Sequence, residues 1–488
     1  MISRTLALKP ILYLVFLFGL SSIQGSQFPN IIIIFADDLG YGDLSCFGSE
    51  TIQTPNLDSL AKEGQKWTQF YSASPICSPS RAALMTGLYP FRTGTDSQVF
   101  YEWSAGGLIP ESHTVAELLK DYNYSTACIG KWHLGHTEEY LPEKHGFDYF
   151  YGIPYSNDMR VDPKMKVSDS INFRKGMNLE KMRSKGNKIK NWVPLMESDL
   201  IIEYPCDQET LTKRYTEKSI QFIQSNQRKP FFLYLSHSMP HIPLMASEKF
   251  KGISQHGPYG DAIVEIDHSV GLIIKTLKSL NIEKNTLIIF TSDNGPDLTY
   301  NRNPGSTGNL QGSKFYPSEG GQRVPAIFWW PGTIEPAVIN QLGSTLDIYS
   351  TIKNLLPKSN KTETPCDSYD LSKVLLKNEL SKRDHFFYLS TGIPPRALVY
   401  AIRKGNWKAH FYKSNPPFYD PNQIIKLDPI KLYNLHSDPT ESNDLAQQHP
   451  EIINEFLGLK SLFDETAKPA FDQSIPKLED QIRPSWAQ

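Results

Sequence analysis

The sequence carries almost no excess of charge: 50 lysines and arginines against 52 aspartates and glutamates give a formal net charge of −2 over 488 residues. A chain without a strong overall field is not expected to have nucleic acid or a membrane surface as its main partner. Beyond the N-terminal region, no apolar run approaches the ~20 residues of a membrane-spanning helix, so we do not expect an integral membrane protein. No internal repeat is apparent. The composition, 39% hydrophobic and 21% charged, indicates a globular chain long enough for one large domain and a smaller one.

The N-terminus has the pattern of a secretory signal peptide. Met1-Ile2-Ser3-Arg4 gives a basic start, an apolar run covers residues 11–20, and small and polar residues follow. We predict a signal peptide over residues 1–25, cleaved near Gly25 or Ser26, because an uncleaved anchor would need a longer apolar run. The mature protein is then exported through the secretory pathway. It would be secreted or lysosomal, or periplasmic in a bacterium.

Export would expose the chain to two kinds of covalent chemistry. Cysteine is scarce, and an oxidising compartment favours pairing of thiols, but an odd number leaves at least one unpaired within a monomer. The five cysteines are Cys46, Cys77, Cys128, Cys206 and Cys366. Two sequons, at Asn123 and Asn360, permit glycosylation in a eukaryote. The sequence leaves the disulfide pairing and the oligomeric state open.

Short apolar runs predict strands that are buried on both faces. These runs are Asn30–Ala36, Pro230–Leu235, Thr286–Thr291 and Ala326–Trp330. Helical patterns lie between them, for instance at residues 56–63 and 264–280. Alternation of strands and helices predicts an α/β fold around a large, mainly parallel sheet.

The C-terminal part follows a different pattern. Residues 386–389, 397–402 and 407–412 resemble short strands separated by turns, and residues 451–463 form a closing helix. We therefore divide the mature chain into a domain over residues 26–364 and a smaller antiparallel subdomain over residues 365–488. A basic insertion at about residues 158–192 lies within the first domain, and we expect it over the rim of the sheet. Its cations are Arg160, Lys164, Lys166, Arg174, Lys175, Lys181, Arg183, Lys185, Lys188 and Lys190.

Polar side chains follow three of the predicted strands directly. They are Asp37 and Asp38, Asp293 and Asn294, and His237 and His241. Ligands of such sheets gather beyond the carboxyl ends of the strands, so we expect these groups to meet at one rim. Adjacent aspartates repel each other unless a cation neutralises them, and hard oxygen ligands suit Ca²⁺ or Mg²⁺ rather than zinc. Turn formation by the Asp and Asn residues is the alternative, and the expected convergence favours a metal.

Two further segments carry groups suited to catalysis. In Gly130-Lys131-Trp132-His133, side chains two residues apart on an extended segment would project to the same side. Lys131 could hold an anion there and His133 could move a proton, although a surface lysine and a hydrogen-bonded histidine would fit the same residues. His241 lies between Pro240 and Pro243, which suits a positioned group or an ordinary rigid loop.

Cys77 lies at what resembles the start of a helix, with Ser78 as the N-cap and Pro79 at the first helical position. The N-terminus of a helix stabilises anions, and Arg81 would strengthen this field. From these residues alone, Cys77 could be a buried small side chain, one half of a disulfide or a nucleophile.

Cys77-Ser78-Pro79-Ser80-Arg81, with Thr86-Gly87 downstream, resembles the signature of the type I sulfatases. Five other segments match motifs of that family: Ser125 to His133, Asp37 to Asp43, Ser292 to Gly295, Glu319 to Pro325, and Leu432 to Glu441. Asn123 departs from the pattern, because the family usually has glycine there. The likeness covers nearly the whole mature chain and is nearest to the arylsulfatase A-like branch. It implies an alkaline phosphatase-like fold, in which residues 26–364 form the catalytic domain.

The resemblance also implies a mechanism. In this family a formylglycine-generating enzyme oxidises the signature cysteine, here Cys77, to formylglycine before folding is complete. One hydroxyl of the aldehyde hydrate attacks the sulfur of a sulfate ester and the alcohol leaves; the second hydroxyl then collapses to the aldehyde and expels inorganic sulfate. The implied cofactor is Ca²⁺, with Mg²⁺ as an alternative.

Site residues follow from the resemblance, position by position. The implied metal ligands are Asp37, Asp38, Cys77, Asp293 and Asn294. The implied catalytic residues are Cys77, Arg81, Lys131, His133, His241 and Lys314. The implied substrate-binding residues are Lys131, Ser156, His241 and Lys314. His237 competes with His241, and the His-x-Pro context favours His241.

The expected activity is therefore hydrolysis of a sulfate ester. A phosphate or phosphonate ester hydrolase of the same superfamily is one alternative, and a non-catalytic carbohydrate-binding relative is another. The substrate could be a sulfated small molecule, glycolipid or glycan. The basic insertion could attract a sulfated polysaccharide, or it could be a solvated loop. The sequence leaves the substrate and the pH optimum open.

Overall fold

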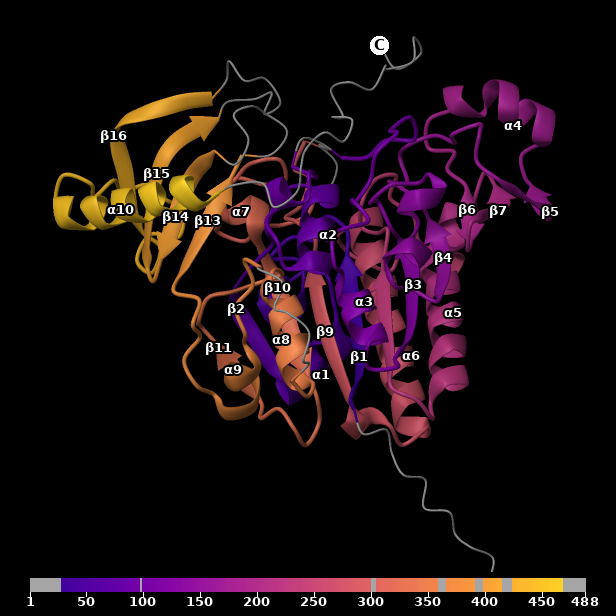
Figure 1. Cartoon of the computed structure of the whole chain (residues 1–488), viewed down its shortest axis with the longest axis horizontal. Helices are drawn as coiled ribbons and strands as arrows, with labels where there is room; N and C mark the ends of the chain where they lie inside the picture. The colour runs from indigo at the N-terminus through magenta and orange to yellow at the C-terminus, as the bar shows by residue number, and fades with distance from the viewer. Residues whose placement is uncertain are drawn as a thin grey trace, which may run out of the picture.

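The computed structural model describes residues 28–96, 99–299, 304–358, 366–390, 398–414 and 424–467. The predicted signal peptide over residues 1–25 and the sequon at Asn360 lie outside the described residues. Figure 1 shows a large sheet with helices on both faces and, beside it, a smaller sheet with one helix against it. Both parts of the predicted fold are confirmed. None of the helices in the described ranges has the length and apolar character needed to cross a membrane.

The large sheet has twelve strands. Its spatial order is β11 (Ala337–Ile339), β2 (Gln65–Tyr71), β10 (Arg323–Trp329), β9 (Thr286–Ser292), β1 (Asn30–Ala36), β8 (Phe231–Ser236), β3 (Ser125–Lys131), β4 (Tyr149–Ile153), β6 (Leu195–Glu197), β7 (Leu200–Tyr204) and β5 (Val167–Phe173). The short β12 (Gly343–Ser344) pairs with β2.

The centre of this sheet, β9-β1-β8-β3-β4, is entirely parallel. Every residue of β1, β8 and β9 is buried, which explains why their sequences are continuous apolar runs and do not alternate. The fourth predicted strand belongs to β10, which runs antiparallel to β9 and β2. In the register, Ala36 pairs with Ser292 and Phe35 with Ser236, so three central strands end at the same level.

Helices cover both faces of the large sheet (Figure 1). One face carries α1 (Pro55–Glu63), α5 (Leu211–Asn226) and α6 (Pro258–Ser279), and α6 packs against both of the others. The other carries α2 (Cys77–Thr86), α3 (Val115–Lys120) and α8 (Asp347–Leu355). The long α6 buries Ile266, Val270, Ile273 and Leu277 at the spacing of one helical face. The short helices α7 (Glu319–Gln322) and α9 (Ser372–Lys377) lie near β10 and α8.

The smaller sheet is an antiparallel meander of β13 (His385–Leu389), β14 (Val399–Lys404), β15 (Trp407–Ser414) and β16 (Ile424–Asn434). Helix α10 (Pro450–Thr466) packs against it, and Phe456 and Phe463 of the helix join Phe387 and Phe411 of the strands in one core. Tyr89, which follows α2, belongs to the same core, so the small sheet and α10 pack against the segment that follows α2.

The basic segment at residues 158–192 contributes to the large sheet itself. It supplies the edge strand β5 and the helix α4 (Leu179–Lys185), which Figure 1 shows beyond β6 and β7 at the upper right. Several of its cations are paired with carboxylates: Lys166 with Glu138, and Arg174 with Asp207. The segment therefore extends the sheet sideways and does not lie over the middle of the rim.

Candidate active site

Two strand ends bring four oxygen-bearing side chains together at the rim of the sheet. Asp37 and Asp38 follow β1, and Asp293 and Asn294 follow β9. All four are 3% exposed or less, a degree of burial that unpaired charges would not tolerate. The backbone N–H of Asp38 donates to Asp293 Oδ1 at 3.1 Å, and Asn294 Nδ2 donates to Asp38 Oδ1 at 2.7 Å. Asp38 has φ = 63°, and this left-handed turn lets both aspartates face the site.

Cys77 is the first residue of α2 and is buried. The Cys77 sulfur, a carboxylate oxygen of Asp37 and one of Asp293 all lie within 4.8 Å of one another. The same sulfur, a carboxylate oxygen of Asp38 and a ring nitrogen of His241 form a second group within the same distance. The expected helix start is wrong in detail, because Ile76 occupies the N-cap position. Ser78 is the second residue of the helix; its hydroxyl donates to the His133 carbonyl at 2.8 Å and accepts from the Phe100 N–H at 3.2 Å.

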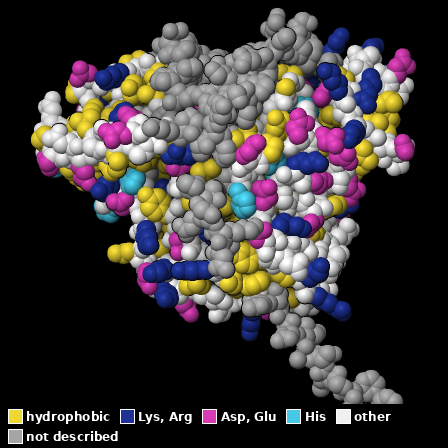
Figure 2. All heavy atoms as spheres, viewed as in Figure 1, with side chains coloured by type: hydrophobic (Ala, Val, Ile, Leu, Met, Phe, Trp, Pro, Cys, Tyr) yellow, Lys and Arg dark blue, Asp and Glu magenta, His cyan; other side chains and the backbone are white. Residues whose placement is uncertain are grey.

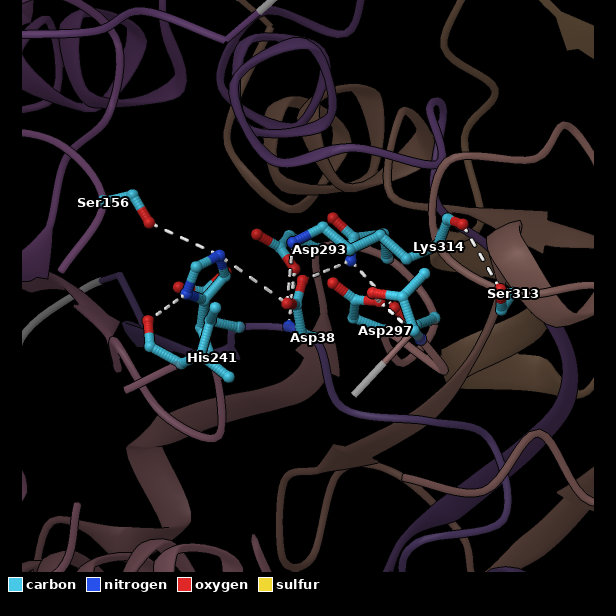
Figure 3. Close-up of polar contacts among 12 residues, drawn as sticks. Asp38, Ser156, His241, Asp293, Asp297, Ser313 and Lys314 are labelled. Carbon is cyan, nitrogen blue, oxygen red and sulfur yellow. Dashed lines mark hydrogen bonds and ion pairs between the residues drawn. The ribbon is translucent and has the colours of Figure 1, made fainter. Parts of the chain in front are cut away.

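Three buried cations face this carboxylate cluster. Arg81 Nη2 lies 2.7 Å from Asp293 Oδ2 and 3.3 Å from Asp37 Oδ1. Lys131, the last residue of β3, places Nζ 2.6 Å from Asp37 Oδ2. Lys314 Nζ lies 2.7 Å from Asp38 Oδ2, and Figure 3 shows its side chain directed toward the aspartates. Carboxylates and cations are thus interleaved in one water-poor centre.

His241 closes the opposite side of the site (Figure 3). Its Nε2 lies 3.4 Å from Ser156 Oγ and 3.7 Å from Asp38 Oδ2, and its Nδ1 lies 2.6 Å from the carbonyl of Ile242. Because the carbonyl can only accept, Nδ1 carries the proton when the ring is neutral, and Nε2 faces the site as an acceptor. Ser156 Oγ also lies 3.4 Å from Lys131 Nζ.

His237 stays outside this cluster. It is fully buried, and neither ring nitrogen has a hydrogen-bond partner among the described residues. Burial lowers the pKa of His237 to about 3, so its ring is neutral at physiological pH. Of the two histidines after β8, the geometry places only His241 among the charged groups of the site.

His133 reaches the site by a different route from the one expected. The extended segment ends at Lys131, and His133 has φ = 59°, so the alternation of side chains along a strand does not apply to it. Its Nε2 lies 3.0 Å from the Phe100 carbonyl, and its buried Nδ1 has no partner among the described residues. Burial and the nearby Lys131 and Arg81 hold the pKa of His133 well below its usual range. The ring is therefore neutral, and with Nε2–H donating to Phe100 its Nδ1 carries the free lone pair.

Burial and neighbouring charges shift the pKa values of the acidic groups in the cluster in different directions. Burial would raise the pKa of Asp37, but Lys131, His241 and Arg81 hold that pKa far below its usual range. Burial and the adjacent Asp37 raise the pKa of Asp293 despite its ion pair with Arg81. Burial also raises the pKa of the Cys77 thiol to about 12, so the unmodified side chain is a thiol and a poor nucleophile at neutral pH.

The donor set fits a hard divalent cation. Among the described residues, Asn294 Oδ1 is buried without a partner, and Asp37 Oδ1 accepts no hydrogen bond. Burial and then the adjacent Asp37 raise the pKa of Asp293, and a cation bound beside it would favour the charged carboxylate. Carboxylate and amide oxygens are the ligands of Ca²⁺ and Mg²⁺. Beside them, Lys131, Lys314 and His241 can bind the oxygens of a tetrahedral anion.

Ser236 is one residue of this site that the sequence reasoning missed. It is the last residue of β8, and its hydroxyl accepts a hydrogen bond from Arg81 Nη1 at 2.5 Å. The rule that strand ends gather at one rim also covers Ser236, so the signal was present in the sequence. Asn123, the first sequon, is exposed after α3. All five cysteines lie in described segments and are unpaired.

Comparisons with known proteins agree along nearly the whole chain. The sulfatase family profile matches residues 29–358, and that of the C-terminal region of aryl-sulfatase matches residues 381–486. N-acetylgalactosamine-6-sulfatase of Canis lupus familiaris is 37% identical over 413 residues, covering 81% of this chain and 74% of that protein. Arylsulfatase A of Homo sapiens is 36% identical over 453 residues, covering 89% of this chain and 87% of that protein.

Solved structures of sulfatases also resemble this chain along most of its length. The PsFucS1 sulfatase from Pseudoalteromonas superposes with a TM-score of 0.77 at 29% identity, covering 91% of this chain and 92% of that one. The phosphonate monoester hydrolase of Agrobacterium radiobacter has a TM-score of 0.57 at 18% identity, covering 92% and 97%, and shows a shared fold alone. The chain belongs to the sulfatase family and is an enzyme that hydrolyses sulfate esters.

Proposed function

We propose that this sulfatase acts through a formylglycine at position 77, assisted by Ca²⁺ bound to Asp37, Asp38, Asp293 and Asn294. The observation that carries the proposal is the meeting of three carboxylates and three buried cations around Cys77. Mg²⁺ is the alternative ion for the same oxygen ligands. The proposed roles follow from the position of each side chain.

Conversion of Cys77 would solve a chemical problem that the unmodified residue presents. A thiol with a pKa of about 12 supplies little thiolate at neutral pH. A formylglycine hydrate would supply one hydroxyl to attack sulfur and a second to expel sulfate. Its formation requires a formylglycine-generating enzyme, which we propose as the maturation partner. Arg81, a fully buried residue of α2, would fix the position of the hydrate.

The remaining side chains have distinct proposed tasks. Lys131 and Lys314 would bind sulfate oxygens and stabilise charge that develops in the transition state, and Ser156 would add a hydrogen bond. His241 would donate a proton from Nε2 to the leaving oxygen when its ring is protonated on both nitrogens. His133, held neutral by burial, would take the proton of the hydrate during sulfate release.

The proposed substrate class is a sulfated glycan, glycolipid or small molecule. Relatives named for N-acetylgalactosamine-6-sulfate and for aryl sulfates are about equally similar to this chain, so their names do not choose between these classes. Comparing a sulfated polysaccharide with a small aryl sulfate, before and after neutralising Lys185, Lys188 and Lys190, tests the basic segment. An equal effect on both substrates would contradict a polyanion-binding role.

We also propose the organisation of the precursor. Residues 1–25 would be a signal peptide that directs export, residues 26–364 the catalytic domain, and residues 365–488 the C-terminal subdomain. Asn123 and Asn360 would carry glycans if the source is eukaryotic. Sequencing the N-terminus of the secreted protein tests the cleavage site near Gly25 or Ser26.

The direct test of position 77 is the Cys77→Ala variant. We expect it to keep the wild-type circular dichroism spectrum and thermal unfolding but to release no sulfate from an aryl sulfate. Cys366→Ala, which removes an exposed thiol, is the matched control and should retain activity. Full turnover by Cys77→Ala would contradict the proposed mechanism. An aryl phosphate measured in parallel tests the alternative, since dominant phosphate hydrolysis would contradict the proposed specificity.

A further inference from the structure

The Glu319-Gly320-Gly321 segment carries a buried carboxylate that does not belong to the catalytic cluster. Glu319 is the first residue of α7 and is fully buried. The hydroxyl of Tyr71, on β2 of the large sheet, donates to its Oε2 at 2.7 Å. The hydroxyl of Tyr388, on β13 of the small sheet, donates to its Oε1, and Lys408 Nζ, on β15, lies 3.2 Å from the same oxygen. One carboxylate is therefore held by both sheets.

The charge on Glu319 is fixed by its neighbours. Burial alone would raise the pKa of this carboxyl, but Lys408, Arg403 and Arg323 hold the pKa far below its usual range. Arg403 Nη1 lies 3.7 Å and Arg323 Nη1 lies 3.6 Å from Oε2. Two of the three cations, Lys408 and Arg403, come from the small sheet.

The small sheet continues this network away from Glu319. Lys408 is fully buried, and its Nζ lies 3.0 Å from Glu441 Oε1 and 4.1 Å from the centre of the Tyr388 ring. The other oxygen of Glu441 is paired with His410. Buried ion pairs of this kind add little net stability relative to apolar packing, but they demand a defined geometry. Their effect at this interface is to fix the position of Glu319.

Glu319 is in turn connected to the catalytic centre through backbone contacts. The Gly320 N–H donates to the Gln311 carbonyl at 2.7 Å, which closes the loop that carries Lys314. The Gly295 N–H, next to Asn294, donates to the Gly321 carbonyl at 2.9 Å. The two segments are tightly packed here, because a Cβ at Gly295 would lie 1.8 Å from the Gly320 carbonyl oxygen.

The same loop also touches the segment before Cys77. The Phe315 N–H donates to the Pro75 carbonyl at 2.9 Å, and the Lys314 N–H donates to the Pro296 carbonyl at 3.0 Å. Displacing the start of α7 would thus move the Lys314 ammonium relative to both Asp38 and α2.

We propose that Glu319 is a positioning residue for Lys314, and that Lys408 and Tyr388 of the C-terminal sheet hold it in place. The C-terminal sheet is then part of the catalytic apparatus without touching the substrate. This inference rests on the proposed role of Lys314 in binding sulfate. It explains why Glu319 and Glu441, which belong to motifs far apart in the sequence, are both buried and both form an ion pair with Lys408.

The test is a double-mutant cycle between Lys408→Met and Lys314→Ala, measured as kcat/KM for an aryl sulfate well below the unfolding temperature. Lys408→Met keeps the length of the side chain and removes its charge. Because small displacements of positioned groups can cost about 100-fold in rate, we expect Lys408→Met to lower kcat/KM by up to that factor. In the Lys314→Ala background, the same substitution should have almost no further effect.

Two additional variants make the outcome decisive. Tyr388→Phe removes a single hydroxyl from Glu319 at nearly constant volume, so it should fold, and we expect a smaller loss that again disappears in the Lys314→Ala background. Lys404→Met removes a half-buried lysine paired with Glu455 at the end of β14, and it should retain wild-type kcat/KM.

Additive losses in the cycle, or wild-type kcat/KM in folded Lys408→Met and Tyr388→Phe, would overturn the positioning role. Failure of both variants to fold would assign the network to folding and would overturn it as well. Wild-type protein without aryl sulfate turnover would instead contradict the proposed substrate chemistry, so the two failures are distinguishable.

Discussion

At the scale of single residues, burial decides which groups of this enzyme are charged. The Cys77 thiol and the rings of His133 and His237 are all kept neutral because desolvation disfavours their charged forms. Neutrality at position 133 is useful in a proton acceptor. Neutrality at position 237 has no such use, and this histidine instead makes folding depend on pH.

His145 offers the clearest test of this dependence. It is buried against Trp132, neither ring nitrogen has a partner among the described residues, and burial lowers its pKa to about 4. The unfolded chain takes up this proton near pH 6.5 and the folded chain only near pH 4. The contribution of the neutral His145 ring to the free energy of unfolding is therefore complete above pH 6.5. As the pH falls from 6.5 to 4, it is lost at ~1.4 kcal/mol per pH unit.

We expect His145→Leu to weaken this loss: between pH 7 and pH 5, its free energy of unfolding should fall by about 2 kcal/mol less than that of the wild type. Urea unfolding at the two pH values measures the difference. His436→Leu, at an exposed histidine, is the control and should follow the wild type. Equal slopes for wild type and His145→Leu would contradict a buried neutral ring.

At the scale of helices and strands, the predictable part of the site is the part set by the sheet. Continuous apolar runs identify β1, β8 and β9, and their parallel arrangement places Asp37 and Asp293 at the same rim. Local sequence does not reveal the left-handed conformation of His133, because it depends on contacts with Phe100 and the strand end. Nor does local sequence reveal that α2 begins at Cys77, because the hydroxyl of Ser78 is held by His133 and Phe100, which are distant in the sequence.

Strand β16 and the ion pair between Glu319 and Lys408 also could not be predicted, because both depend on tertiary packing. Most residues of strand β16 are half-buried or exposed, and it contains Pro429, which argues against a strand when only the sequence is read. The pairing of Glu319 with Lys408 joins residues 89 positions apart, and nothing in either segment indicates the other. Edge strands and long-range ion pairs become visible only with the tertiary packing.

Glycines test the close packing of loop elements at the rim. Gly295→Ala would push a methyl group against the Gly320 carbonyl, so we expect a loss of about 1–3 kcal/mol in the free energy of unfolding and reduced sulfatase activity. Gly458→Ala, on the exposed side of α10 with open space around it, should raise stability by about 0.5–1 kcal/mol because alanine favours helix. Thermal unfolding compares the two variants; a stabilised, fully active Gly295→Ala would contradict the contact.

At the scale of the whole molecule, charge is balanced overall but concentrated at one rim. Figure 2 shows lysines, arginines and acidic residues interspersed over the visible face, in keeping with a net charge of −2. Buried beneath the rim, three carboxylates and three cations converge on residue 77. We expect both the activity and the thermal stability of the enzyme to depend on a cation that binds to this cluster.

Metal removal tests that dependence. Chelation should abolish aryl sulfate hydrolysis, and added Ca²⁺ should restore it and raise the unfolding temperature, since binding at 100 times Kd stabilises by ~2.7 kcal/mol. Asp293→Asn should respond only at higher Ca²⁺ concentrations, whereas Glu180→Gln, at an exposed acid, should match the wild type. Full activity of the metal-free protein, with unchanged unfolding, would contradict a metal-dependent site.

Sulfate release by the proposed mechanism requires a formylglycine at position 77 of the active enzyme. Mass spectrometry of the peptide that carries this residue, taken from protein purified in an active state, tests this requirement directly. We predict the mass expected when the CH₂–SH group of cysteine has become CHO, in proportion to the sulfate-releasing activity of each preparation. A fully active preparation in which Cys77 is an unmodified thiol throughout would contradict the account.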